Sequence, residues 1–233
     1  MTRLDQRFDP RLDDEDEPET PDTPDEPDVP EPRGPEPKEP SDNRTLSSPI
    51  NELESRLLRQ RKVLIFGAIN DKVARDVTGR LLALASEGTG PIDVFINSPG
   101  GHVESGDTIH DMIRFVRDLV PVRVIGTGWV ASAGALIFLA GYKKNRLCLP
   151  NTRFLLHQPM GGVRGPATDI DIEAREIIKM RERINQIIAR ETGQPIAKVI
   201  DDTDRNYWMG ADEAIAYGMC DRVINSGKDL DAA

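Results

Sequence analysis

The residues of this chain with the clearest chemical potential are a serine and a histidine that lie 25 positions apart. Ser132 stands in the small-residue run GWVASAGA, and His157 follows the apolar run FLL. A serine hydroxyl attacks a carbonyl efficiently only when a positioned base takes its proton. A serine at a strand-to-helix turn, with a histidine at the end of a nearby strand, therefore indicates acyl-transfer chemistry.

Each of these two residues also has a simpler interpretation. Glycine and alanine around Ser132 are typical of a tight contact between a helix and a strand, and His157 alone could be a hydrogen-bonded core histidine. The other histidines are weaker candidates for the base, because His102 adjoins a glycine turn and His110 lies within a predicted helix. No lysine lies near Ser132 in the sequence.

A third feature is the turn NSPGG, which ends in Gly100 and Gly101 between a predicted strand and a predicted helix. Paired glycines let backbone amides approach a ligand closely, which suits an oxyanion hole or an anion site. A strand-to-helix turn also requires glycines for its own geometry, so the turn alone leaves both interpretations open. It is not a dinucleotide-binding fingerprint, because the pattern G-x-G-x-x-G is absent.

The elements that must position these residues alternate between short apolar runs and helical patterns. We predict strands over 63–67, 92–97, 122–125, 146–149 and 153–157, and helices over 71–86, 106–119 and 132–142. Such alternation implies right-handed crossovers and a largely parallel, buried sheet. The predicted fold class is α/β.

One predicted helix, from Thr168 to about Glu191, carries apolar residues on more than one face. These are Ile170, Ile172, Ile177, Ile178, Met180, Ile184, Ile187 and Ile188. A helix with several apolar faces needs more than one packing surface, so we expect it to project toward another subunit. An ordinary core helix is the alternative.

The N-terminal segment differs from the rest in composition. Residues 1–50 contain 16 acidic and 6 basic residues and 11 of the 18 prolines, whereas residues 51–233 contain 24 acidic and 24 basic residues. Such a segment cannot bury enough apolar surface to offset its chain entropy. We therefore expect a disordered acidic tail over 1–46 and a single domain over 47–233. The tail's simplest role is solubilising; a cleaved pro-segment and a partner-docking arm stay open.

Composition also excludes several classes of protein. Cys148 and Cys220 lack metal-ligand spacing, so neither a disulfide framework nor a zinc site is indicated. No apolar stretch approaches about 20 residues, and the acidic N-terminus has no apolar signal core, so we expect a cytoplasmic protein without membrane contact. The charge-balanced body and acidic tail argue against nucleic-acid binding.

Taken together, the motifs resemble those of the proteolytic subunit of the Clp protease, a serine peptidase that works with ring-shaped ATP-driven unfoldases. The resemblance extends from about Ser55 to Ile224 and leaves out the acidic tail. It rests on FINSPGG at 95–101, ASAGA at 131–135, HQPMGG at 157–162, GPATDIDIEAREI at 165–177 and WMGADEA at 208–214. It implies a crotonase-like fold of repeated β-β-α units with a protruding handle helix.

The resemblance also implies roles for individual residues. Ser132 matches the nucleophile, His157 matches the general base, and the amides of Gly101 and Ala133 would form the oxyanion hole. The segment that pairs with an extended peptide, by strand addition, matches Gly100, Met160, Gly161, Gly162 and Val163. The helix from Thr168 matches the handle through which two seven-membered rings interlock into a tetradecamer.

One position departs from the family pattern. The triad of the family closes with an aspartate, and here the matching stretch DRNYW places Asn206 at that position. An asparagine can orient the histidine but brings no charge to stabilise the imidazolium, and the same change in trypsin costs about 10⁴ in turnover. Asp202 and Asp204 are neighbours that could substitute. The loop before Ser132 is also about two residues longer than in common members.

The resemblance implies a serine endopeptidase subunit that hydrolyses unfolded polypeptides delivered by a hexameric AAA+ Clp unfoldase. No metal or organic cofactor is implied, and ATP would be used by the unfoldase, because this chain has no P-loop. A second interpretation is a weakly active or regulatory subunit that pairs with a triad-bearing paralogue. A third is an acyl-CoA enzyme of the crotonase type.

Overall fold

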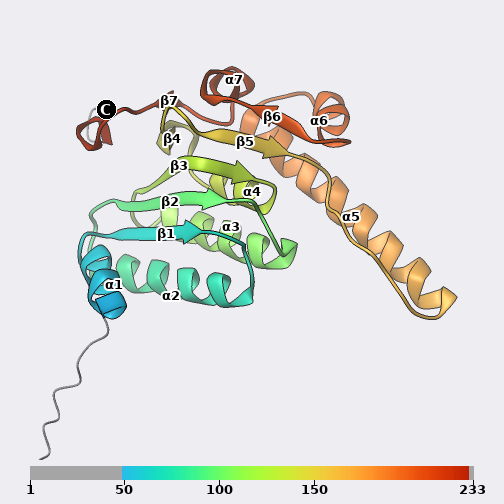
Figure 1. Cartoon of the computed structure of the whole chain (residues 1–233), viewed down its shortest axis with the longest axis horizontal. Helices are drawn as coiled ribbons and strands as arrows, with labels where there is room; N and C mark the ends of the chain where they lie inside the picture. The colour runs from blue at the N-terminus through green and yellow to red at the C-terminus, as the bar shows by residue number, and fades with distance from the viewer. Residues whose placement is uncertain (1–48, 231–233) are drawn as a thin grey trace, which may run out of the picture. The chain divides into compact units, whose positions relative to one another are not determined.

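The described part of the chain, residues 49–230 of the computed structural model, alternates helices and strands along most of its length (Figure 1). The elements are α1 (Pro49–Arg59), β1 (Lys62–Phe66), α2 (Asp71–Glu87), β2 (Ile92–Ser98), α3 (Val103–Arg117), β3 (Val122–Ala131), α4 (Ala133–Phe138), β4 (Arg146–Cys148), β5 (Arg153–Leu156), α5 (Ala167–Thr192), α6 (Ile196–Thr203), β6 (Tyr207–Met209), α7 (Ala211–Tyr217) and β7 (Arg222–Val223). The predicted disorder of the tail and the boundary after residue 46 lie outside the described residues.

The strands form one sheet, which confirms the predicted α/β fold class. Strands β1, β2, β3, β4 and β7 are neighbours in that order, and every pair among them is parallel. The long strand β3 pairs with β4 along its first half and with β5 along its second half. Strand β6 then adds to β5 in the antiparallel direction.

The main core lies between this sheet and the helices α2, α3 and α4, which cover one face (Figure 1). Buried β-branched and apolar residues of β1 and β2 contribute to it, as expected for strands of a parallel sheet. A smaller cluster on the other face joins Ile125, Leu147 and Ile224. Elsewhere among the described residues, the large apolar side chains of Phe66 and Trp129 are about half exposed.

Strand β3 contains an irregularity that shapes the approach to Ser132. Its register against β2 shifts between Ile96 and Ser98, and Gly128 adopts a positive φ of 58°. The side-chain carbonyl of Asn97 accepts a hydrogen bond from the Trp129 N–H at 3.0 Å and so satisfies this donor at the irregularity. This bulge carries the end of β3 to the turn that holds Ser132.

Helix α4 is shorter than the predicted helix over 132–142. Ser132 has a positive φ and cannot be its first residue, so the helix begins at Ala133. After Phe138 the chain tightens, because the amides of Ala140 and Gly141 donate to carbonyls only three residues back. The predicted start, at about Ser132, is therefore confirmed to within one residue, and the predicted end at Tyr142 was wrong.

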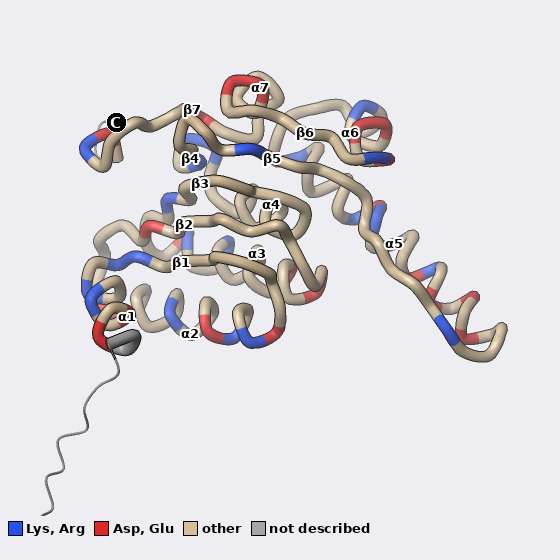
Figure 2. Tube along the Cα trace, in the orientation of Figure 1, with Lys and Arg blue, Asp and Glu red and all other residues tan. Residues whose placement is uncertain are grey.

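Helix α5 projects away from the sheet, which confirms the predicted protruding helix (Figure 1). Its C-terminal part packs against the core through Ile184 and Ile188, and it ends at Gly193 in the left-handed conformation. Its N-terminal part leaves Ile170, Ile172 and Ile178 exposed. Figure 2 shows acidic and basic residues along its length, and the pairs Asp171–Arg175 and Glu176–Lys179 form ion pairs. None of the helices within 49–230 is long and apolar enough to cross a membrane.

Candidate active site

Ser132 lies in the turn between β3 and α4 with φ 54° and ψ −121°, a conformation that costs a non-glycine residue backbone strain. The turn is held because the Ser132 N–H donates to Leu155 O at 3.0 Å and the Ser132 carbonyl accepts from Ala135 N at 2.9 Å. Gly100 permits the turn to approach, since a Cβ at Gly100 would lie 2.6 Å from the Ser132 Cβ. The hydroxyl is thus presented at the carboxyl end of the parallel sheet, where ligands of α/β proteins bind.

The second glycine of the turn, Gly101, directs its amide toward the same region. Ile69 and Gly101 form a parallel bridge in which the Ile69 N–H donates to Gly100 O and Ile69 O accepts from the His102 N–H, each at 2.9 Å. In such a bridge the N–H of the opposite residue points to the other side. Ile69 follows β1, so the Gly101 N–H points away from β1, to the side on which β3 neighbours β2. A Cβ at Gly101 would lie 2.1 Å from Ile69 O, which leaves room only for glycine.

The amide of Ala133 opens helix α4 directly after Ser132. The first N–H groups of a helix have no partner within the helix, so this donor can serve another acceptor. Close packing holds α4 in place: a Cβ at Gly106 of α3 would lie 3.0 Å from the Ala133 Cβ, and a Cβ at Gly134 would lie 3.3 Å from the Ser98 Cβ. The sequence therefore uses small residues on both sides of the serine turn.

His157 follows the last residue of β5 and faces Asn206, which precedes β6. The antiparallel ladder pairs Leu156 with Tyr207, so its next position places His157 opposite Asn206. Nδ1 of His157 lies 3.2 Å from Oδ1 of Asn206. The amide oxygen can only accept, so Nδ1 carries the proton and Nε2 is left as an acceptor.

The two aspartates near Asn206 are engaged elsewhere. Asp202 Oδ2 accepts hydrogen bonds from Tyr217 and Lys198, each at 2.7 Å. Asp204 accepts from the side-chain amide of Gln158 and lies 3.4 Å from Nη2 of Arg181. Neither aspartate bonds to His157, so the partner of the histidine in this structure is the asparagine.

Ser132 and His157 line the same narrow pocket of about 30 Å³. Its other walls are Val103, Ala133, Leu136, Leu156, Pro159, Ile184 and Ile188, which are all apolar. Helix α5 contributes the last two of these side chains. The pocket therefore joins a hydroxyl and an imidazole to a surface that suits an apolar side chain.

The segment after His157 has the properties of an open pairing edge. Residues 159–165 form no helix or strand, and Met160 is 81% exposed. A Cβ added at Gly162 would meet nothing within 4 Å. Between Met160 and Arg164 the backbone bonds to no other segment within 49–230. Its N–H and C=O groups are therefore available to an added strand.

The other histidines and both cysteines do not line the pocket of Ser132 and His157. His110 is buried, and its Nδ1 lies 2.7 Å from Leu136 O. Burial lowers the pKa of His110, because it disfavours the charged form of the ring. His102 contacts Ser105 through Nδ1 at 2.9 Å. Cys148 and Cys220 are buried free thiols, and no cluster of potential metal ligands occurs among the described residues.

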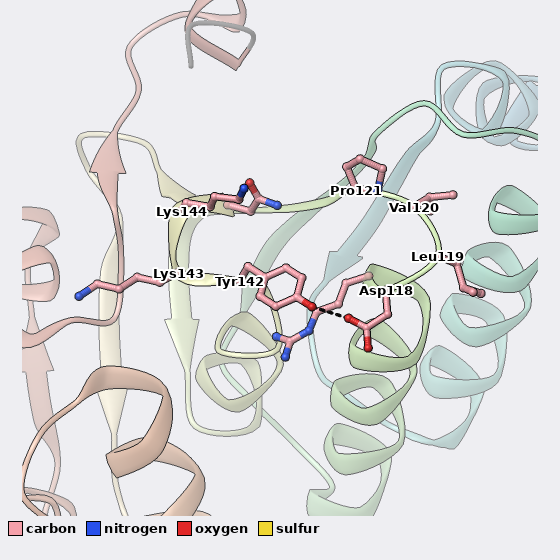
Figure 3. A pocket seen from close by; sticks show the side chains of 9 residues that line it. Asp118, Leu119, Val120, Pro121, Tyr142, Lys143 and Lys144 are labelled. Carbon is pink, nitrogen blue, oxygen red and sulfur yellow. Dashed lines mark hydrogen bonds between the residues drawn. The ribbon is translucent and has the colours of Figure 1, made fainter.

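A cavity of about 630 Å³ lies away from this chemistry (Figure 3). It is lined by Arg117, Asp118, Leu119, Val120, Pro121, Tyr142, Lys143, Lys144 and Asn145, at the ends where β3 and β4 begin. The Tyr142 hydroxyl donates to Asp118, and this bond raises the pKa of Tyr142. The cavity contains neither Ser132 nor His157, so it is separate from the candidate active site.

Sequence reasoning missed two supporting side chains. Asn97 satisfies the amide of Trp129 in the bulge before the serine, and Gln158 binds the turn that leads to Asn206. Both occur inside the motifs NSPGG and HQP, but their partners are distant in sequence. Only the register of the sheet brings those partners close.

Comparison with known proteins gives consistent matches. The family described as Clp protease matches residues 47–227. The ATP-dependent Clp protease proteolytic subunit 2 of Gluconobacter oxydans is 75% identical over 189 residues, which cover 81% of this chain and 85% of the relative. Subunit 3 of Rhizobium etli is 54% identical over 190 residues, covering 81% of this chain and 97% of the relative.

Solved structures agree with the sequence matches. ClpP1 from Listeria monocytogenes is 51% identical, with a TM-score of 0.69 over 77% of this chain and 99% of that chain. An asparagine-to-aspartate variant of the same protein has a TM-score of 0.71 at the same identity and coverage.

Proposed function

Because the chain belongs to the Clp protease family and is similar to its proteolytic subunits, we propose that it is a serine endopeptidase that uses Ser132, His157 and Asn206. The observation that carries this proposal is the pairing of His157 with Asn206 beside a pocket shared with Ser132. The strained serine turn supports it, since such strain persists where the surrounding structure enforces it.

In the proposed mechanism, Ser132 Oγ attacks the scissile carbonyl while Nε2 of His157 takes its proton. Asn206 accepts the Nδ1–H bond, which fixes the tautomer that leaves Nε2 free. The amides of Gly101 and Ala133 donate to the oxyanion that forms on the carbonyl oxygen. His157 then protonates the leaving amine, and a water molecule repeats the sequence to release the acyl group.

The substrate in this proposal is an extended, unfolded polypeptide. Met160, Gly161, Gly162 and Val163 would pair with it as an added strand, and Gly100 would let it approach closely. Main-chain pairing of this kind tolerates many sequences. The apolar pocket next to Ser132 would then receive one apolar side chain beside the scissile bond.

The proposed assembly is a barrel of two stacked seven-membered rings. Exposed Ile170, Ile172 and Ile178 on α5 support a packing partner outside this subunit. The barrel would receive polypeptide from a hexameric AAA+ Clp unfoldase that consumes the ATP. We also infer a cytoplasmic location and no cofactor of its own for this chain.

A second candidate role is a weakly active or regulatory subunit in a mixed barrel with a paralogue. The observation that favours it is the neutral amide of Asn206 where a carboxylate would stabilise the imidazolium. The peptidase role and the role in a mixed barrel involve the same residues. They differ in whether the isolated subunit hydrolyses peptides.

Hydrolysis of a small fluorogenic peptide by the purified full chain, alone and mixed with a paralogue from the same cell, separates these roles. Turnover by the isolated chain that disappears in Ser132→Ala supports the first. Turnover only in the mixture supports the second. Its loss when this chain carries Ser132→Ala then indicates a weakly active subunit, and its persistence indicates a regulatory one. Turnover by the isolated chain that survives Ser132→Ala would overturn the site assignment.

A further inference from the structure

The turn that carries Asn206 is attached to the residue after His157 by three hydrogen bonds. The Gln158 N–H donates to Thr203 O at 2.6 Å. The Gln158 side-chain amide donates to Asp204 O at 2.7 Å and to Asp204 Oδ1 at 3.3 Å. Gln158 thus binds, through backbone and side chain, the residues that lead into Asn206.

This attachment begins where the strand pairing ends. The β5–β6 ladder contains three residue pairs and stops at Leu156 and Tyr207. His157 and Asn206 lie one position beyond it, on segments that would otherwise leave the sheet at its edge. Asn206 is therefore held by β6 on one side and by the Gln158–Asp204 bonds on the other.

Thr203, whose carbonyl accepts the Gln158 N–H, is itself held in the core. Thr203 is fully buried, and its hydroxyl oxygen lies 2.8 Å from Val199 O of α6 and 3.0 Å from Asn185 Oδ1 of α5, the two acceptors that share its proton. Asn185 is buried as well. Gln158 therefore joins the histidine to a fixed point of the fold, rather than to a free loop.

A neutral third residue makes such attachment more important for the chemistry. The contact between His157 and Asn206, at 3.2 Å, lies at the long end of the N–H···O range and has no charge to strengthen it. The charge of an aspartate would attract the forming imidazolium even if the two side chains were slightly misplaced relative to each other. An amide oxygen offers much less attraction, so the orientation of the ring depends more on where the backbone places both partners.

We propose that Gln158 is a positioning residue of the Ser132–His157–Asn206 site: its side-chain amide keeps Asn206 in register with His157 during the transfer of the proton. This inference rests on the proposed function. The bond between Gln158 and Asp204 is solvent-exposed, so it contributes little to stability. A purely structural role therefore predicts almost no effect of its loss, whereas a positioning role predicts slower chemistry.

The test uses Gln158→Ala in the full-length, assembled protein. We expect kcat for a fluorogenic peptide to fall about tenfold or more, because small misplacements of reacting groups cost rate steeply. KM should stay within about twofold, and the thermal unfolding temperature should stay near that of the native chain. The rate at which a fluorophosphonate labels Ser132 should fall in proportion to kcat, because that reaction needs the same histidine.

Gln158→Glu gives a second, pH-dependent readout. An ionised glutamate has no N–H or O–H to donate to Asp204, but a protonated one can donate again. The ratio of variant to native kcat/KM should therefore rise as pH falls from about 7 toward the titration range of a carboxyl group near Asp204. Gln194→Ala is the matched control, since the Gln194 side-chain amide also donates to a backbone carbonyl, Tyr217 O at 3.0 Å, and does not line the pocket of Ser132. Its kcat should stay native.

The outcomes separate this inference from the proposed function. If Gln158→Ala keeps native kcat and labelling rate while native Ser132 is labelled, the positioning role is wrong and the proposed function stands. If the native chain and its mixtures with a paralogue are not labelled at Ser132, the proposed function fails and this inference fails with it. A loss of rate in Gln194→Ala equal to that in Gln158→Ala would also contradict it.

Discussion

His157 and Asn206 face each other one residue beyond the last pair of the antiparallel β5–β6 ladder, with Nδ1 of the histidine 3.2 Å from Oδ1 of the asparagine. The register of this ladder places Asn206, and not Asp204, opposite the histidine. Asp204 lies two residues away on the chain, yet its side chain faces Gln158 and Arg181. The strand register therefore gives His157 a neutral partner, the amide of Asn206.

We expect Asn206→Asp to raise turnover by about tenfold. A carboxylate at this position would stabilise the imidazolium that forms when Ser132 attacks. We expect this gain to be smaller than the loss of about 10⁴ that the reverse change causes in trypsin. Peptide hydrolysis by the assembled variant and native chain measures it, and unchanged turnover in a correctly folded variant would argue against Asn206 as the partner in catalysis.

Gly101→Ala should abolish peptide hydrolysis. The added Cβ would lie 2.1 Å from Ile69 O, so the turn that presents the Gly101 amide must shift. Gly79→Ala in α2 is the matched control, since its Cβ would meet nothing within 4 Å and alanine favours a helix by about 1 kcal/mol. Full activity in Gly101→Ala would show that this amide is not needed.

The buried His110 should make the fold sensitive to mild acid. Burial lowers its pKa below the usual 6.5, so the unfolded chain binds a proton more readily than the folded one. The contribution of neutral His110 to the free energy of unfolding is therefore fully present above about pH 6.5, and it declines as pH falls toward the lowered pKa. His110→Gln keeps a donor for Leu136 O without this titration, so its thermal unfolding temperature should fall less between about pH 7 and pH 5. An identical slope for both proteins would contradict this account.

A charge on the exposed face of α5 should split the proposed barrel. Ile178 is 56% exposed in the single subunit, and burying an unpaired glutamate in an interface costs several kcal/mol. Ile178→Glu should therefore sediment as single rings or smaller species, while the control Ala216→Glu on α7 keeps the native mass. Native sedimentation of Ile178→Glu would place the assembly surface elsewhere.

Much of the site could be predicted because its signals are local. Ser132 stands among small residues and His157 ends an apolar strand, and the carboxyl ends of parallel strands lie along one edge of a sheet. The alternation of strands and helices predicted the α/β class for the same reason. Asn206 followed from the family resemblance, and the structure adds that it contacts the histidine.

The remaining features depend on contacts between distant segments. The positive φ of Ser132 could not be predicted from sequence, because the contacts that hold its turn come from Gly100 and Leu155, which are distant in the chain. Ile184 lies on a helix that projects outward, yet it lines the pocket beside Ser132. The periodicity of α5 indicated several apolar faces without showing which one packs within its own subunit.

The most direct test of the catalytic assignment is the site of covalent labelling by a fluorophosphonate in the assembled native protein. Peptide mapping by mass spectrometry should find the adduct on Ser132, and Ser132→Ala should remove it while the assembly keeps its mass. Labelling should also weaken strongly in His157→Ala, because the serine then lacks its base. An adduct on another residue, or undiminished labelling of Ser132→Ala, would contradict the assignment of Ser132 as the nucleophile.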